Sequence, residues 1–273
     1  MRKDLHITKH NTDDCWYSSI CEKFQTDECS WKCRRMQQTK FLLDLSNLSR
    51  VHKRPLALDI RKVNKEAGQY INEVLNDPEF FVRRGYNAYF YGPTGTGKTS
   101  WACKILLNYF SAIAETNNSV CRGLFISVPE LLRDLKFDIN HPDNMPDFVE
   151  FIHTIQDTDL VIWDEIGDLN YTNYECQWVY SFVNHRIANK RANIFVGNCT
   201  PETLSAADPA LYSRICTGSD CIEFDGMDLR VNNTFSSAIA KYLQDNPGIF
   251  DLDSENYQGI PPLSDAAELS SDK

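Results

Sequence analysis

Residues 92–99 read Gly92-Pro93-Thr94-Gly95-Thr96-Gly97-Lys98-Thr99, directly after the apolar run at 88–91. This is the spacing G-x-x-x-x-G-K-[ST], whose glycines let backbone N–H groups turn towards phosphate oxygens. In such a loop the lysine reaches the β- and γ-phosphates, and the hydroxyl that follows it binds Mg²⁺. The helix expected from Lys98 onwards adds the partial positive charge of its N-terminus. The stretch therefore predicts a site for ATP and Mg²⁺ between a strand and a helix.

An acidic pair completes this predicted site. The apolar run at 160–163 ends in Asp164-Glu165. In this position the aspartate lies beside the metal and the glutamate polarises the attacking water. The alternative, an ordinary strand end with an acidic cap for the next helix, loses weight because the phosphate loop is present. We expect Thr99 and Asp164 to hold Mg²⁺ and Glu165 to be catalytic. The expected nucleotide-binding residues are Gly92, Pro93, Thr94, Gly95, Thr96, Gly97, Lys98, Thr99, Ser100 and Asp164.

Polar side chains later in the chain are further candidates for catalysis. Asn198 directly follows an apolar run, where it would lie between the acidic pair and the γ-phosphate and orient water. Arg214 or Arg230 could act as an arginine finger, which stabilises the charge that develops on a transferred phosphoryl group. Arg186 is a lesser candidate for that role. The alternatives are an asparagine that caps a turn before Pro201 and surface arginines in salt bridges.

The fold class follows from the alternation of apolar runs with amphipathic stretches. Strands are expected at 88–91, 123–127, 159–164, 193–197 and 221–224, and helices at 98–114, 129–135, 148–155 and 176–189. This alternation predicts an α/β fold in which helices cover a five-stranded parallel sheet. Two helices, at 32–48 and 67–82, are expected before the sheet. After Asp245 the acidic sequence rich in Ser, Asp and Pro is typical of a disordered tail.

Composition and charge limit the possible functions. The 273 residues are 42% hydrophobic with a net charge of −10, and mean hydropathy is −0.42. No apolar run approaches the roughly 18 residues that span a bilayer, and the N-terminal segment has no apolar signal region. We expect a cytoplasmic protein without a membrane partner. Its acidity argues against tight, non-specific duplex binding but leaves room for local contacts with single strands.

Four of the ten cysteines lie close together near the N-terminus: Cys15, Cys21, Cys29 and Cys33. Disulfides are disfavoured because an ATP-dependent protein works in the reducing cytosol. Four thiolates suffice for a tetrahedral structural Zn²⁺; His6, His10 or His52 could replace one of them. The alternatives are four free thiols in a small helical domain and, less favoured, an iron–sulfur cluster.

These motifs, in this order, make the chain resemble the DnaC/DnaI-type replicative helicase loaders, especially phage-encoded ones, which are related to IstB-type ATPases. The resemblance covers roughly residues 15–230 and rests on the pieces at 91–99, 125–132, 163–167, 184–186 and 197–201, with Cys33-Arg34-Arg35 before them. It implies an AAA+ P-loop core. Only residues 199–245 lie between Asn198 and the tail, too few for the C-terminal helical lid of most AAA+ proteins, and the loaders lack that lid.

The resemblance implies three parts: an N-terminal cysteine domain (1–54) that docks on the helicase, an AAA+ ATPase domain (55–240) and an acidic tail (241–273). Asn198 would be sensor 1, Arg214 the arginine finger and Arg230 a sensor-2-like residue. The implied function is ATP-dependent loading of a hexameric DnaB-type helicase onto single-stranded DNA at replication initiation, with self-association through the ATPase domain.

Two other functions stay open: an IstB-type transposition helper ATPase, and a nucleotide-dependent adaptor in which hydrolysis is incidental. Candidate contacts to single-stranded DNA are Lys136, Phe137 and the stretch 170–174, which reads Asn-Tyr-Thr-Asn-Tyr. Aromatic side chains in such positions stack on bases. The alternative is that these tyrosines pack on the core.

Overall fold

The computed structural model describes residues 15–18, 21–24, 26, 28–29, 33–53, 56, 58–115, 120–139, 145–167 and 171–226. The chain divides into two compact units, Met1–Asp228 and Leu229–Lys273. The second unit lies outside the described residues, as do Arg230 and the predicted tail, so the following concerns the first unit. Among the described residues, no helix is long and apolar enough to cross a bilayer.

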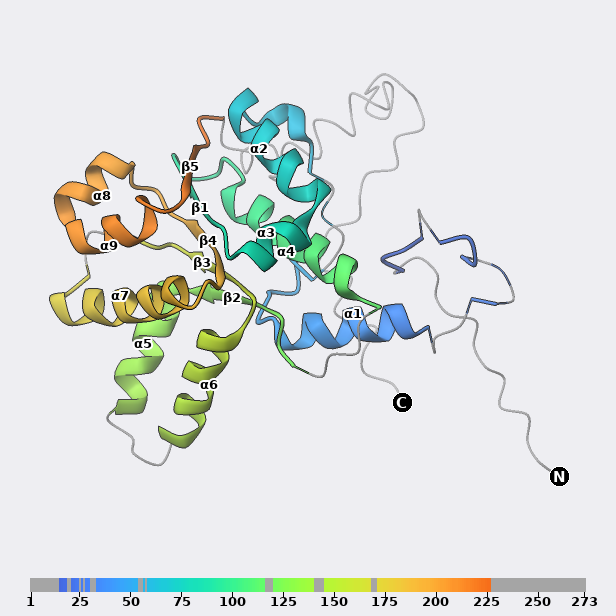
Figure 1. Ribbon diagram of the computed structural model, residues 1–273, viewed down its shortest axis with the longest axis horizontal. Coiled ribbons are helices and arrows are strands. Elements are labelled where there is room, and N and C mark those ends of the chain that lie inside the picture. Colours follow the sequence, from blue (N-terminus) through green and yellow to red (C-terminus); the bar gives the residue numbers. More distant parts are fainter. Residues whose placement is uncertain are drawn as a thin grey trace, which may run out of the picture. The chain divides into compact units, whose positions relative to one another are not determined.

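A five-stranded, all-parallel sheet forms the centre of this unit (Figure 1). Its strands are β1 (Asn87–Tyr91), β2 (Gly123–Ser127), β3 (Leu160–Asp164), β4 (Ala192–Val196) and β5 (Asp220–Glu223), in the order β2-β3-β4-β1-β5. Each begins within one residue of its predicted position, and the α/β fold with five parallel strands is confirmed. Because the strands are parallel, their carboxyl ends share one edge of the sheet, where ligands bind in open α/β folds.

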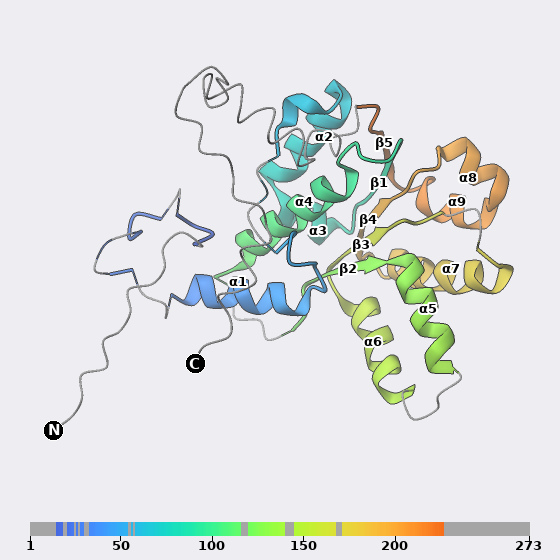
Figure 2. The ribbon, with the colours of Figure 1, turned by 180° about the vertical axis from the view of Figure 1, so that it is seen from behind.

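Helices cover both faces of the sheet (Figures 1 and 2). On one face lie α1 (Arg34–Leu45), α2 (Lys65–Asn76), α3 (Pro78–Arg84) and α4 (Lys98–Ile113), with the short helix η2 (Ile60–Lys62). On the other lie α5 (Val128–Ile139), α6 (Met145–Asp157), α7 (Asn173–Ala188), α8 (Pro201–Ala207) and α9 (Pro209–Ile215). Strand residues alternate between two cores: Leu160 and Ile162 face the first, Val161 and Trp163 the second, as the twofold period of a strand requires.

Local sequence explains where the helices differ from expectation. The helix expected at 67–82 is two helices, because Pro78 has no N–H to continue α2 and Asp77 accepts a hydrogen bond from Phe80 N to start α3. Two short helices, α8 and α9, were not expected. Each begins the same way, with Thr200 or Asp208 as the cap and a proline at the first helical position.

The segment after α1 is joined to the sheet edge. Ser46 O accepts a hydrogen bond of 2.8 Å from Phe125 N in β2, and Asn47 Nδ2 donates to Phe125 O at 3.2 Å. Leu42, Leu43 and Leu48 are buried in the first core. Residues of the predicted N-terminal domain therefore pack on the core of the sheet, and the domain boundary at 54 stays a prediction.

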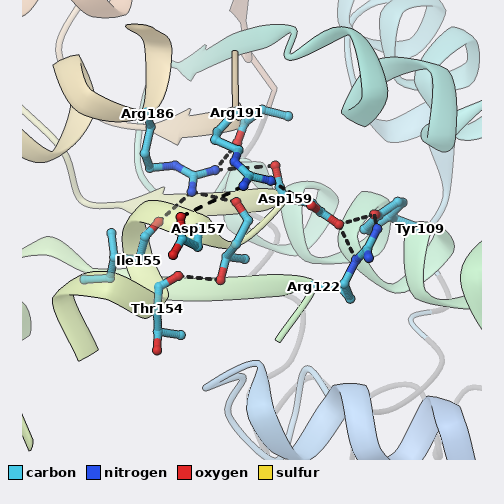
Figure 3. A network of polar contacts seen from close by, with 10 residues as sticks. Tyr109, Arg122, Thr154, Ile155, Asp157, Asp159, Arg186 and Arg191 are labelled. Atoms are coloured by element: carbon cyan, nitrogen blue, oxygen red, sulfur yellow. Dashed lines mark hydrogen bonds and ion pairs between the residues drawn. The ribbon is translucent and has the colours of Figure 1, made fainter. Parts of the chain in front are cut away.

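At the amino ends of the strands, a buried arginine joins α7 to its surroundings (Figure 3). The Arg186 side chain is 0% exposed. Its guanidinium donates to Ile155 O at 2.6 Å, Thr158 O at 2.7 Å and Ala192 O at 2.6 Å, and to Asn193 Oδ1 at 2.7 Å. Burial, with repulsion from Arg191, lowers its pKa to about 9, so the group is still protonated at neutral pH. It thus donates to three backbone carbonyl groups and one side-chain oxygen within the core.

We expect Arg186→Leu to lower the free energy of unfolding by at least about 3 kcal/mol, since each buried polar group left unsatisfied costs roughly 1–3 kcal/mol. Urea denaturation followed by circular dichroism measures it. Arg133→Leu is the matched control, because that side chain is 70% exposed and pairs with its neighbour Asp134; its change should stay within about 0.5 kcal/mol. Equal, small losses for both variants would contradict the structural role of Arg186.

Candidate nucleotide-binding site

The loop between β1 and α4 adopts a shape that requires glycine. Gly92, Gly95 and Gly97 have φ values of 127°, 81° and 91°, in a region that side chains disfavour. A Cβ atom on Gly92 would lie 2.3 Å from Phe224 O, and Phe224 N in turn donates to Tyr91 O at 2.8 Å. The loop is thus pressed against the backbone that follows β5, and only glycine fits there.

Lys98 and Thr99 lie where the motif predicts. Lys98 is 5% exposed, and its Nζ donates to Gly92 O at 2.8 Å and Pro93 O at 2.6 Å. The ammonium group therefore lies within the phosphate loop. Thr99 Oγ1 donates to Asp164 Oδ1 at 2.9 Å. This bond brings together two motifs that are 65 residues apart in the sequence.

The acidic pair ends β3. Burial raises the pKa of Asp164, and the charge of Glu165 acts in the same direction, whereas the bond from Thr99 and the charge of Lys98 oppose the rise. A hydroxyl and a carboxylate oxygen 2.9 Å apart are oxygen ligands of the kind that Mg²⁺ takes, so the residues present fit this ion.

Glu165 is exposed and has a φ of 59°, which is uncommon for a residue with a side chain. Tyr171 Oη donates to Glu165 O at 2.9 Å, and Ile166 N donates to Val196 O of β4 at 2.9 Å. The turn that carries Glu165 is therefore fixed on both sides of this residue. Backbone conformations of this kind concentrate at functional sites.

Asn198 is exposed in the loop after β4, beside a glycine that sequence reasoning missed. A Cβ atom on Gly197 would lie 2.6 Å from Ile166 O and 2.7 Å from Tyr89 Oη. Only a glycine lets this loop approach the turn after Glu165 so closely. Its position between a strand and a polar residue was the available signal.

The same loop is held by two further bonds. Tyr89 Oη donates to Cys199 O at 2.7 Å, and Cys199 Sγ donates to Gly167 O at 3.2 Å. Burial is the main cause that raises the pKa of Tyr89, so this hydroxyl is a donor at neutral pH. The loop of Asn198 is thereby tied to β1 and to the turn after Glu165, two of the elements that bear the predicted site.

Of the three arginine candidates, one is exposed, one is buried and one lies outside the described residues. Arg214 is exposed on α9; its Nε and Nη2 lie 3.3 Å from Tyr180 Oη of α7, and its Cζ lies 5.7 Å from that ring's centroid. Arg186 as a lesser finger candidate is wrong, because it is fully buried and bonded within the core. Arg230 lies outside the described residues.

The four N-terminal cysteines line one pocket, together with Tyr17, Phe24 and other side chains. Yet within the described part of the chain no group of three or more His, Cys, Asp or Glu is placed to hold a metal. His52 lies elsewhere, with its Nδ1 3.0 Å from Ser49 Oγ, while His6 and His10 lie outside the described residues. The structure gathers the thiols and does not place them as metal ligands.

Among the candidate DNA contacts, the lysine is already paired. Lys136 Nζ lies 2.7 Å from Glu175 Oε1, and Glu175 also closes the capping box that begins α7. Hydrogen bonds from Lys136 and Thr172 lower the pKa of Glu175 to about 2. Phe137 and Tyr174 are exposed by 56% and 50%. Asn170 lies outside the described residues.

Comparison with known proteins identifies a family of ATP-binding proteins. The sequence profile of the family described as IstB-like ATP binding protein matches residues 6–233. No curated protein matches significantly.

Among solved structures, DnaI matches at 18% identity over 68% of this chain and 98% of its own, with a TM-score of 0.50. The DnaC helicase loader matches at 16% identity over 67% and 96%, with a TM-score of 0.49. Domain III of the Thermotoga maritima replication initiation protein DnaA matches at 19% identity over 67% and 71%, with a TM-score of 0.48. At these identities, the likeness to DnaI is one of fold.

Proposed function

Because the chain belongs to the IstB-like ATP-binding protein family, we propose that it is a Mg²⁺-dependent ATPase that loads a hexameric DnaB-type helicase onto single-stranded DNA in the cytoplasm. The bond of 2.9 Å between Thr99 Oγ1 and Asp164 Oδ1 carries the ATPase part, since it joins the phosphate loop to the acidic pair. The loader part rests on the sequence resemblance and on the cysteine-lined pocket that precedes α1. An IstB-type transposition helper is the second candidate, because the matching family profile bears that name.

In this proposal each residue has one role. Lys98 binds the β- and γ-phosphates, and Thr99 and Asp164 hold Mg²⁺, which neutralises charge on the phosphates when bound. Glu165 polarises the attacking water. Asn198 orients that water, because its loop is tied to the turn after Glu165.

Arg214 is proposed to act in a neighbouring subunit. The phosphate loop supplies its own lysine but no arginine. Arg214 is exposed and contacts the Tyr180 hydroxyl, so a site on another copy can reach its guanidinium. The ATPase domain would then hydrolyse ATP only after self-association. Exposed Phe137 and Tyr174 are proposed to stack on bases of single-stranded DNA.

Mixing two inactive variants tests the shared site. Arg214→Ala should bind ATP normally and hydrolyse it slowly, because an arginine from a partner contributes roughly 10³- to 10⁵-fold in rate. Lys98→Ala should fail to bind ATP. The mixture should regain part of the phosphate release, since each variant supplies what the other lacks. Arg133→Ala is the surface control. Full activity of Arg214→Ala alone, or an inactive mixture in which both variants co-assemble, would refute a role for Arg214 in trans.

Capture of the partner tests the loader function. A tagged Glu165→Gln chain should keep bound ATP without turnover and retain a DnaB-type helicase when isolated from its native cells, as detected by immunoblot. The matched control is Lys98→Ala, which should retain less helicase because it does not bind ATP. Recovery of a transposase in place of the helicase would favour the second candidate. Turnover at the wild-type rate by Glu165→Gln would show that the acidic pair is misassigned.

We also propose that Cys15, Cys21, Cys29 and Cys33 bind one Zn²⁺ after a small rearrangement of the pocket they line. Elemental analysis of the freshly reduced full-length protein should find about one zinc per chain, as four thiolates fill a tetrahedral site. Replacing Cys21 and Cys29 with serine should abolish zinc binding, whereas Cys121→Ser should leave it unchanged. A folded, reduced protein that contains no metal would exclude this site.

A further inference from the structure

Two cysteines outside the predicted sites lie close together where α9, the helix that bears Arg214, leads into β5. Cys216 caps the C-terminal end of α9, and Cys221 is the second residue of β5. Cys221 Sγ lies 4.0 Å from Cys216 O and 4.0 Å from Ser219 O. Both side chains are partly exposed, so small solutes can reach them. The turn at 216–219 therefore places the Cys221 sulfur beside the backbone of Cys216.

This arrangement makes the two thiols unequal. A hydrogen bond between the side chains lowers the pKa of Cys221, although burial and the carboxylates of Asp220 and Glu202 act against the change. The same bond is the main cause that raises the pKa of Cys216. Cys221 is therefore the nucleophile of the pair, since thiolates and not thiols attack electrophiles. Cys216 lies close enough to react with an oxidised form of Cys221.

In three other cysteines of the core, burial and not a neighbouring thiol is the main cause of the pKa shift. Cys103 is 0% exposed, and burial is the first cause that raises the pKa of Cys103, Cys121 and Cys176. Cys121 Sγ donates to backbone carbonyl groups of Leu45 and Gly123. Thiols whose pKa is raised by apolar surroundings react slowly. Cys103, Cys121 and Cys176 therefore serve as internal references for the reactivity of Cys216 and Cys221.

We propose that Cys216 and Cys221 form a redox-active dithiol that closes to an intramolecular disulfide when a peroxide is the oxidant. The Cys221 thiol ionises, its thiolate attacks one peroxide oxygen and the O–O bond breaks. The departing hydroxide takes up the proton that the thiol released, so a sulfenic acid and water result. The Cys216 sulfur then attacks the sulfenic sulfur, its proton leaves with the hydroxyl group, and a second water is released. Two thiols and one hydrogen peroxide thus give one disulfide and two waters.

The position of the pair connects it to hydrolysis, and this step rests on the proposed role of Arg214. Arg214 lies two residues before Cys216, in the last turn of α9. A disulfide requires the sulfur atoms to approach to about 2.05 Å, which draws that turn towards β5. Misplacement of a catalytic group by about 1 Å can slow a reaction roughly 100-fold. Oxidation should therefore slow hydrolysis and leave nucleotide binding intact.

Peptide mass spectrometry of the reduced full-length protein tests the dithiol directly. After brief treatment with hydrogen peroxide and alkylation, trypsin releases residues 215–230, which contain both cysteines. We expect this peptide to be unalkylated and two hydrogens lighter, and dithiothreitol to reverse the change. In Cys216→Ser, Cys221 should instead be trapped as a sulfenic acid by dimedone. Full alkylation of both cysteines, while Cys103, Cys121 or Cys176 is oxidised, would overturn the proposal.

Phosphate release tests the connection to Arg214. Oxidised wild type should hydrolyse ATP about 10- to 100-fold more slowly than reduced protein, with unchanged binding of a fluorescent ATP analogue. Cys216→Ser should resist this loss, and the control Cys176→Ser should behave as wild type. A disulfide that forms without slowing hydrolysis would overturn the connection to Arg214. A reduced protein without ATPase activity would contradict the proposed function, while the mass measurement would still decide the dithiol.

Discussion

The predicted ATP site depends on one feature of the sheet: β4 lies between β1 and β3, and all three run in the same direction. Their carboxyl ends consequently meet at one edge, although the sequence between β1 and β4 also contains β2 and four helices. With this strand order, Thr99 and Asp164 lie close enough to form their hydrogen bond of 2.9 Å. The close approach of Gly197 to Ile166 O and Tyr89 Oη has the same origin, because β4 must deliver Asn198 between the other two loops.

The amino ends and the carboxyl ends of these strands differ in the interactions that their residues make. At the amino ends, Arg186 and Asn193 satisfy buried polar groups, and Asn193 also accepts from Trp163 Nε1 at 3.0 Å and donates to Asn87 Oδ1 at 2.7 Å. Such a fully bonded network specifies one arrangement of the strands. At the carboxyl ends the loops contain glycines with positive φ and the exposed Glu165. A network of hydrogen bonds at the amino ends of the strands thus supports the loops of the predicted site at their carboxyl ends.

The strands and the phosphate loop were predictable because their signals are local: apolar runs, glycine spacing and an acidic pair at a strand end. The break at Asp77-Pro78 was readable too, but the helical pattern at 67–82 masked it. The role of Arg186 was beyond sequence reasoning, because its partners come from α6, β4 and the segment before β3 and a buried arginine looks like a surface one in a sequence. The proximity of Cys221 Sγ to Cys216 likewise depends on how α9 meets β5.

The hydrogen bond from Phe125 N to Ser46 O has a practical consequence for anyone dividing this protein. β2 is one of the two edge strands of the sheet, and Ser46 occupies part of its open side. A fragment that starts at residue 55 would leave those backbone groups without a partner and uncover the apolar surface beneath Leu42 and Leu43. Bare strand edges recruit other chains, so such a fragment would be prone to precipitate. A truncated chain that keeps the sheet edge covered has to begin ahead of Arg34, the first residue of α1.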